Sequence, residues 1–256
     1  MKPAGSFSQL KSTARQNLAG NYMTFFLAIV TALGLSFAID SILSWTAAPL
    51  LAGQGLFSMI AGLMVTFLVH SFVTVLQAGI LYVSLNIARR SQATVGDVLL
   101  GFRYHPETAI AISLLTGLLR TVCTLPLYFA MDRIYALGLY DISGTGKTPS
   151  PLLAVSGFLA GLIAAAALDF LILYSYSQAL FLYIDHQDYS ALQCLQESRR
   201  LMKGRRIRYL MLNLSFLGYA ALSVLSLGLG CIWAIPYYNV TCAEFYMELS
   251  GNYSGY

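Results

Sequence analysis

Long runs of residues without a charge dominate the chain. No Asp, Glu, Lys or Arg occurs over residues 16–39, 41–88 or 209–243. Each residue adds about 1.5 Å to a helix, so about 20 apolar residues cross a hydrocarbon core of about 30 Å. The pattern therefore predicts an all-α fold, a polytopic membrane helix bundle that forms a single domain.

The number of spans depends on how the longest runs divide. Residues 41–88 are too many for one helix, and Pro49 and Gly53 supply turn residues within them. Residues 209–243 would form one helix of about 52 Å, too long for one crossing and short for two. A tight turn at 226–230 favours two spans; the alternative is one span that ends near Pro236, followed by a helix on the outer surface. We expect six spans, at about 22–43, 57–88, 108–131, 152–184, 207–225 and 231–249.

Positive side chains gather in three of the segments outside the predicted spans. They are Lys2, Lys11 and Arg15 before the first span, Arg89, Arg90 and Arg103 after the second, and Arg199, Arg200, Lys203, Arg205, Arg206 and Arg208 after the fourth. Because positive charge is retained on the cytoplasmic side, this asymmetry predicts a cytoplasmic N-terminus, and six spans return the C-terminus to the cytoplasm. The polar stretch before Tyr22 does not resemble a cleavable signal peptide, so we expect the first span to stay in the mature protein.

The same three segments share a pattern of polar and apolar positions. Ser6, Gln9, Arg15 and Gly20 align with Ser190, Gln193, Arg199 and Gly204. In each segment Ser or Thr can cap a helix, an apolar stripe follows, and Gly ends it. We predict amphipathic interfacial helices over 6–20, 94–101 and 190–204, with basic faces toward anionic headgroups. The six spans then form three hairpins, each preceded by one such helix.

Composition supports a membrane protein and disfavours other classes. Charged residues make up 10% of the chain and AVILMFWYC residues 57%, whereas a soluble domain carries about 25% charged residues. The net charge of +4 is small and local, which argues against nucleic-acid binding. The four cysteines form no CxxC pair, which argues against zinc and against a disulfide framework.

Three polar side chains lie at membrane depth in the predicted spans: His70, Arg120 and Asp169. A charge near the bilayer centre costs at least about 2.5–3.5 kcal/mol, so each should face protein or a watery cavity and find a partner. Arg120 and Asp169 lie on adjacent antiparallel spans at similar depth, which predicts an ion pair. One interpretation is a structural pair that orients two helices, with a hydrogen-bonded His70. The other is a substrate or proton site in which His70 titrates.

Four stretches resemble a bacterial integral-membrane family catalogued as domain of unknown function nine-seven-five. They are Leu-Lys-Ser-Thr-Ala-Arg-Gln-Asn-Leu-Ala-Gly-Asn-Tyr at 10–22, Leu-Ser-Phe-Leu-Gly-Tyr at 214–219, the glycine-rich stretch 225–237, and Thr-Cys-Ala-Glu-Phe-Tyr at 241–246. The resemblance spans nearly the whole chain and is strongest after residue 188. It implies a multi-span protein of the bacterial inner membrane, and it transfers no catalytic residues.

The sequence favours a non-enzymatic role over a catalytic one. It contains no His/Glu metal motif, no exposed serine nucleophile turn and no paired intramembrane carboxylates, so we expect no catalytic residues, cofactor or metal. The three basic segments favour a protein that acts by interaction with a membrane-protein partner or with lipid. The alternative is a small transporter or exporter component that uses a polar site around His70, Arg120 and Asp169. A cavity that reaches Arg120 from water would discriminate between the two.

Overall fold

The computed structural model describes residues 6–51, 56–103, 106–136, 151–186 and 188–251, and these ranges contain helices and turns but no strand. The first half holds α1 (Phe7–Leu18), α2 (Tyr22–Leu51), α3 (Leu56–Ala88), η1 (Val95–Leu99), α4 (Leu100–Arg103) and α5 (Pro106–Ala136). The second half holds α6 (Pro151–Leu168), η2 (Asp169–Leu173), α7 (Tyr174–Tyr176), α8 (Ala179–Asp185), α9 (Ala191–Leu201), α10 (Arg206–Leu214), α11 (Leu217–Leu225) and α12 (Cys231–Ser250). The predicted all-α fold is confirmed.

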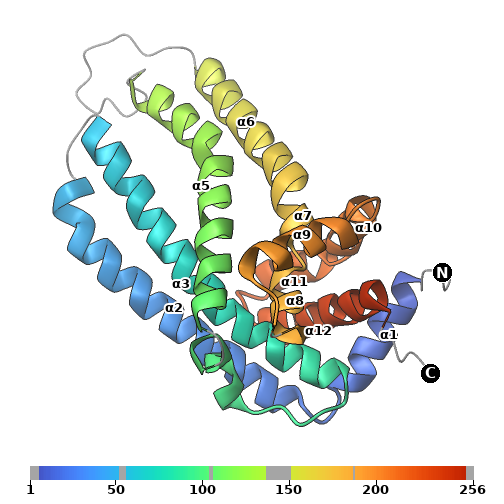
Figure 1. Ribbon diagram of the computed structural model, residues 1–256. Helices are drawn as coiled ribbons and strands as arrows, with labels where there is room; N and C mark the ends of the chain where they lie inside the picture. The colour runs from blue at the N-terminus through green and yellow to red at the C-terminus, as the bar shows by residue number, and fades with distance from the viewer. Residues whose placement is uncertain (1–5, 52–55, 104–105, 137–150, 187, 252–256) are drawn as a thin grey trace.

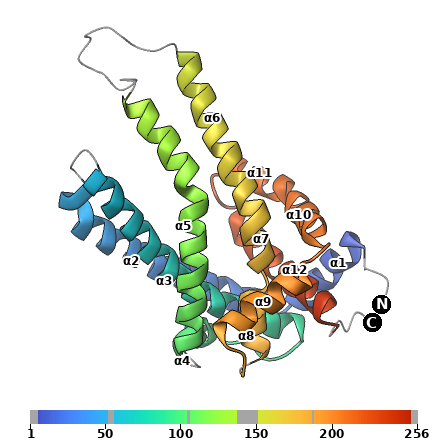
Figure 2. The same ribbon diagram turned by 45° about the horizontal axis from the view of Figure 1, so that its top comes forward.

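Two long helical hairpins form one end of the molecule. α2 packs on α3, α5 packs on α6, and α3 joins the two pairs through its contact with α5 (Figures 1 and 2). A glycine permits the contact between α5 and α6: a Cβ at Gly161 would lie 2.6 Å from the Cβ of Ala130 and 3.0 Å from the carbonyl oxygen of Pro126. The close approach of two backbones is the usual use of small residues between membrane helices.

Within the described residues, five helical stretches are long and apolar enough to cross a membrane. They are Tyr22–Ala48, Ile60–Ala88, Glu107–Ala130, Val155–Asp185 and Arg206–Leu225. These stretches are compatible with a multi-pass membrane protein, and they match the first five predicted spans. The sixth predicted span, 231–249, corresponds to α12, which is not among them, so six spans in three hairpins are not confirmed.

α12 lies beside α1 rather than alone against lipid. It contacts α1, α3 and α2, and most of its C-terminal half is buried. The Tyr22 hydroxyl, at the start of α2, donates a 2.7 Å hydrogen bond to the carbonyl oxygen of Ile232 near the start of α12. Asn17, at the end of α1, donates a 2.8 Å hydrogen bond to Glu244. Both halves of α12 therefore contact the junction between α1 and the first candidate span.

The predicted similarity between 6–20 and 190–204 extends to their conformation. Ser6 and Gln9 form a capping box at the start of α1, and Ser190 and Gln193 form the same box at the start of α9. The glycines that end the two segments, at positions 20 and 204, both have left-handed φ angles, +91° and +77°. Glycine adopts this conformation without the steric cost that a Cβ imposes.

The apolar faces of these segments are covered by protein. Leu10 and Ala14 of α1, Cys194 of α9 and Val98 of η1 are fully buried. η1 sits so close to α3 that a Cβ at Gly79 would lie 1.8 Å from the Val98 carbonyl oxygen. Part of the apolar stripe of each segment therefore packs into the helix bundle. The predicted contact of the basic faces with anionic headgroups stays a prediction.

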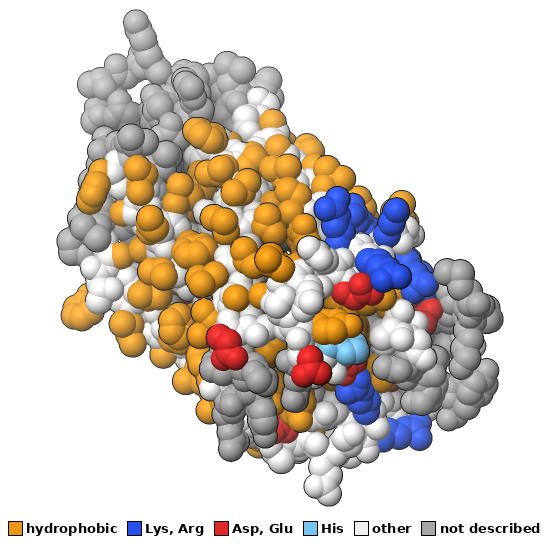
Figure 3. Space-filling model, viewed as in Figure 1, with side chains coloured by type: hydrophobic (Ala, Val, Ile, Leu, Met, Phe, Trp, Pro, Cys, Tyr) orange, Lys and Arg blue, Asp and Glu red, His pale blue; other side chains and the backbone are white. Residues whose placement is uncertain are grey.

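Charged and apolar side chains separate on the surface. In the view of Figure 3, apolar side chains cover the face formed by the two long hairpins, and Lys, Arg, Asp and Glu gather toward the opposite end, over the C-terminal helices and near the start of α5. A helix bundle that spans a membrane shows this division, since the lipid-facing belt excludes charge. The fold thereby places a polar end beneath an apolar belt.

Candidate ligand-binding cavity

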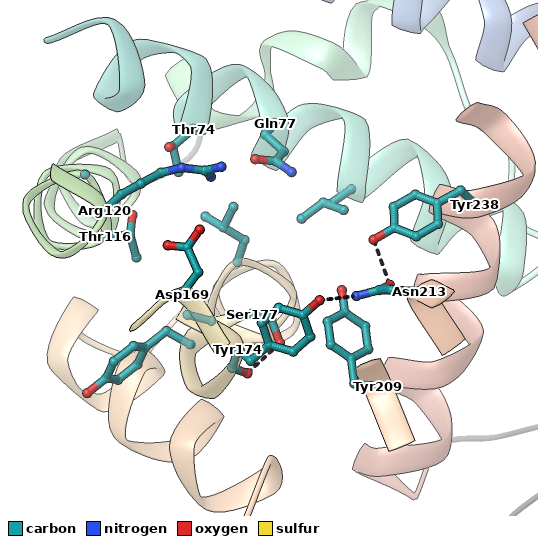
Figure 4. Close-up of a pocket in the computed structure, with 15 residues that line it drawn as sticks. Thr74, Gln77, Thr116, Arg120, Asp169, Tyr174, Ser177, Tyr209, Asn213 and Tyr238 are labelled. Atoms are coloured by element: carbon teal, nitrogen blue, oxygen red, sulfur yellow. Dashed lines mark hydrogen bonds between the residues drawn. The ribbon is translucent and has the colours of Figure 1, made fainter. Parts of the chain in front are cut away.

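A cavity of about 370 Å³ lies where the two hairpins meet the C-terminal helices (Figure 4). It is lined by Thr74, Gln77 and Leu81 of α3, Thr116, Gly117 and Arg120 of α5, Asp169 of η2, Tyr174 and Tyr176 of α7, Ser177, Ala179 and Leu180 beside and within α8, Tyr209 and Asn213 of α10, and Tyr238 of α12. Its size falls in the usual range of small-molecule sites, about 300–1,000 Å³. Its walls are unusually polar for a bundle of this composition.

Asp169 reaches the cavity from an irregular turn. It begins η2, a π-helical segment of five residues, inside the candidate span Val155–Asp185. A π-helical turn rotates the residues that follow it relative to a regular α-helix, and such turns are frequent at functional sites. One carboxylate oxygen of Asp169, Oδ1, is buried and accepts no hydrogen bond. A buried carboxylate oxygen without a donor is costly, which marks this position as a candidate site.

Arg120 faces the same cavity from α5. Figure 4 shows its side chain extended into the space between α3 and η2, close to Thr74 and Gln77, with the Asp169 carboxylate on the other side. No Arg120 nitrogen lies within the 4.0 Å of an Asp169 oxygen that defines an ion pair. The structure thus brings the two predicted residues to one cavity, but it does not join them in the expected ion pair.

The third predicted residue, His70, belongs to α3, and its side chain lies outside the described part of the structure. Thr74 and Gln77 follow it on α3 by about one and two helical turns, and both line the cavity. The expectation that His70 takes part in the polar cluster stays a prediction.

The wall opposite α3 and α5 is held by a chain of neutral hydrogen bonds. The Tyr238 hydroxyl donates to Asn213 Oδ1 at 3.0 Å, and Asn213 Nδ2 donates to the Tyr174 hydroxyl at 3.0 Å (Figure 4). Three helices that are distant in sequence are tied together here. Sequence reasoning missed these residues because it searched for charges. The available signal was Gln77 and Asn213, two amide side chains within otherwise apolar runs.

A second polar group lies at the charged end of the molecule, outside the five candidate spans. Glu244 is 1% exposed, and its Oε1 accepts a hydrogen bond from Asn17 Nδ2, whose side-chain oxygen accepts one from Arg90 Nε at 3.0 Å. Burial raises the pKa of Glu244 to about 7, and the Asn17 hydrogen bond and the nearby Arg90 charge oppose this rise. The group connects α1, the end of α3 and α12.

Two further ion pairs hold the C-terminal helices together. Arg89 pairs with Asp185, which also accepts a 2.8 Å hydrogen bond from the Tyr246 hydroxyl. Arg208 binds both carboxylate oxygens of Glu248, at 2.6 and 2.9 Å. Bidentate arginine–carboxylate contacts are among the strongest charge-assisted hydrogen bonds. The described residues hold no group of three or more His, Cys, Asp or Glu side chains suited to a metal ion.

Apolar helices of spanning length around a polar cavity define the class: they are compatible with a multi-pass membrane protein of helical type. The chain belongs to the family described as "Protein of unknown function (DUF975)", whose model matches residues 4–253. The family expected from the sequence is thereby confirmed. No curated protein and no solved structure matches the chain.

Proposed function

We propose that this protein binds a small polar solute in the cavity and serves as a transporter or exporter component without catalytic activity. The observation that carries the proposal is the Asp169 carboxylate, which faces a cavity of about 370 Å³ with a buried oxygen that lacks a donor. Polar groups at membrane depth are rare and commonly mark solute pathways. Arg120, on the facing helix, adds a second charge to the same space.

The basic segments give less support to a role in interaction than the sequence suggested. Arg89 and Arg208 form intramolecular ion pairs, Arg90 bonds Asn17, and Lys11 Nζ donates a 3.0 Å hydrogen bond to the carbonyl oxygen of Ser215. These side chains hold the C-terminal helices in place. Their internal partners leave them less free to bind a separate protein.

The basic side chains at the end of α9 favour a more limited interaction. Arg199, Arg200 and Lys203 are exposed, and Arg200 has only a 3.6 Å contact with Glu197 of its own helix. Surface pairs of this kind contribute little energy, so these cations stay available. We propose that they contact anionic headgroups of the cytoplasmic leaflet.

The contacts of the C-terminal helices favour a topology with both chain ends on one side. The Arg208–Glu248 contact joins the start of α10 to the end of α12, and the Asn17–Glu244 bond joins the end of α12 to α1. This arrangement opposes the alternative in which a C-terminal helix lies on the outer surface. With positive charge kept inside, the shared side is the cytoplasm, which for a bacterial protein is that of the inner membrane.

The hairpin of α10, α11 and α12 then enters the membrane from the cytoplasmic side and returns. Its turn carries Leu227, which is 96% exposed, and no charged residue occurs over 209–243. Cys231 and Glu244 are 13 residues apart, about 20 Å of helix, whereas the hydrocarbon core is about 30 Å thick. An apolar tip at this depth lies in lipid rather than in external water. We propose that the hairpin stops within the membrane, in place of the fifth and sixth predicted spans, although Arg206–Leu225 is by length and composition able to cross one.

Cysteine accessibility tests the cavity. Each native cysteine is replaced by Ala, and Thr116→Cys is introduced on the cavity side of α5, with Leu118→Cys as its control. Leu118 is on the same helix and 55% exposed on the lipid-facing surface. A charged, membrane-impermeant thiol reagent, applied to intact cells and to inverted vesicles, should modify position 116 from one side and leave position 118 unmodified. The thiolate is the reactive form, and it needs water to ionise. An unreactive position 116, or equal rates at both positions, would overturn the proposal.

A further inference from the structure

Three polar side chains converge on the cavity. The Oδ1 of Asp169 is buried and accepts no hydrogen bond, and the guanidinium of Arg120 and the amide of Gln77 are exposed at the cavity wall. They come from three different elements, α5, α3 and η2, and Figure 4 shows that all three reach into one space. By contrast, the amide of Asn213 on the opposite wall is bonded through both its oxygen and its nitrogen.

The two charges have opposite signs, and their separation restricts the ligand. An ion pair would neutralise Arg120 and Asp169 directly, but their charged atoms are farther apart than 4.0 Å. A ligand that carries only an anion would satisfy Arg120 and leave the carboxylate bare, and a simple cation would do the reverse. A charge without a partner at membrane depth is costly, so a ligand that neutralises only one of the two charges is disfavoured.

Resting on the proposed function, we propose that the cavity takes a zwitterion of amino-acid size. Its anionic group lies against Arg120 and Gln77, because guanidinium and amide N–H groups both donate to a carboxylate. Its ammonium lies against Asp169 and supplies the hydrogen-bond donor that Oδ1 lacks. The apolar remainder lies against Leu81 and Leu180, which line the same cavity.

The opposite wall suits such a ligand. The Tyr174 hydroxyl accepts its hydrogen bond from Asn213, so its own hydrogen remains for a further acceptor. Tyr209 and Tyr238 add aromatic surface to that wall. Mixed apolar walls with a few convergent polar groups are typical of small-molecule sites, in which the polar groups fix the orientation of the ligand.

Three probes of matched shape test the charge requirement: leucine, 4-methylpentanoate, which lacks the ammonium, and 3-methylbutylamine, which lacks the carboxylate. Binding to the purified full chain in lipid nanodiscs is measured by calorimetry. Leucine should bind at least about tenfold more tightly than either analogue, because each lost charge-assisted contact weakens binding by about one to two powers of ten. Equal binding of an analogue, or no binding of leucine, would overturn the zwitterion proposal.

A variant assigns the ammonium contact to Asp169. Asp169→Asn keeps the size of the side chain and should abolish the preference for leucine over 4-methylpentanoate, whereas Asp188→Asn, an exposed position outside the cavity, should retain it. A merely structural role would weaken both probes equally and would contradict the assignment. This test can fail while the proposed function stands. If Thr116→Cys is labelled but leucine is not preferred over its analogues, the solute-binding cavity is retained and only the zwitterion proposal is refuted.

Discussion

The buried carboxyl of Glu244 should make the stability of this protein depend on pH, and replacing it with Gln should remove that dependence. Glu244 is 1% exposed and bonded to Asn17, within the contact of α12 with α1. Burial raises its pKa from an ordinary value of 4.5 to about 7. Gln keeps the oxygen that accepts the Asn17 hydrogen bond and has no charge to bury.

The sign of the effect follows from proton binding. Between pH 4.5 and pH 7 the folded protein keeps the Glu244 proton while the unfolded chain has lost it, so stability falls as pH rises through this window. Below pH 4.5 both states are protonated, and above pH 7 both are ionised, so the penalty is constant there. At about 1.36 kcal/mol per pKa unit, the difference from 4.5 to about 7 corresponds to a penalty of about 3 kcal/mol.

The assay compares unfolding of the natural protein and Glu244→Gln in the same detergent from pH 4 to pH 8. The variant should gain about 3 kcal/mol relative to the natural protein across this range, on top of any constant offset from altered hydrogen bonding. Glu197→Gln is the control, since Glu197 is on the surface of α9 and its contact with Arg200 is worth under about 1 kcal/mol. Parallel pH profiles for the natural protein and Glu244→Gln would refute the reasoning.

Two further measurements test the packing of α3 and the depth of the C-terminal hairpin. Gly79→Ala should lower the free energy of unfolding by about 1–3 kcal/mol, because its Cβ would overlap the backbone of Val98. The control Gly34→Ala has open space around it and should leave the free energy of unfolding unchanged. Equal effects of the two variants would contradict the close contact between α3 and η1. Leu227→Cys in the cysteine-free background should resist an impermeant thiol reagent from both sides of the membrane, whereas Gln92→Cys should react only after permeabilisation. Labelling of Leu227→Cys from outside would instead support six complete spans.

The all-helical fold and most of its elements could be predicted from local sequence patterns. Uncharged runs long enough to cross a membrane favour helices, because unpaired backbone groups in lipid are too costly. Capping signals were equally local: Ser6 with Gln9, and Ser190 with Gln193, begin α1 and α9 as predicted. The turn at 226–230 was found from its glycines, and it separates α11 from α12.

The position of α12 and the lining of the cavity depend on long-range packing. The uncharged run 209–243 and its glycine turn predicted one more crossing at 231–249, but Glu244 and Glu248 find their partners on α1 and α10, so α12 packs beside them. Asp169 and Arg120 were found from their charge, yet no local pattern predicted that Asp169 begins the π-helical turn η2. Neutral residues such as Asn213 join the site only when distant helices meet. Long-range contacts of this kind depend on packing, and the spacing of polar residues along a helix does not encode them.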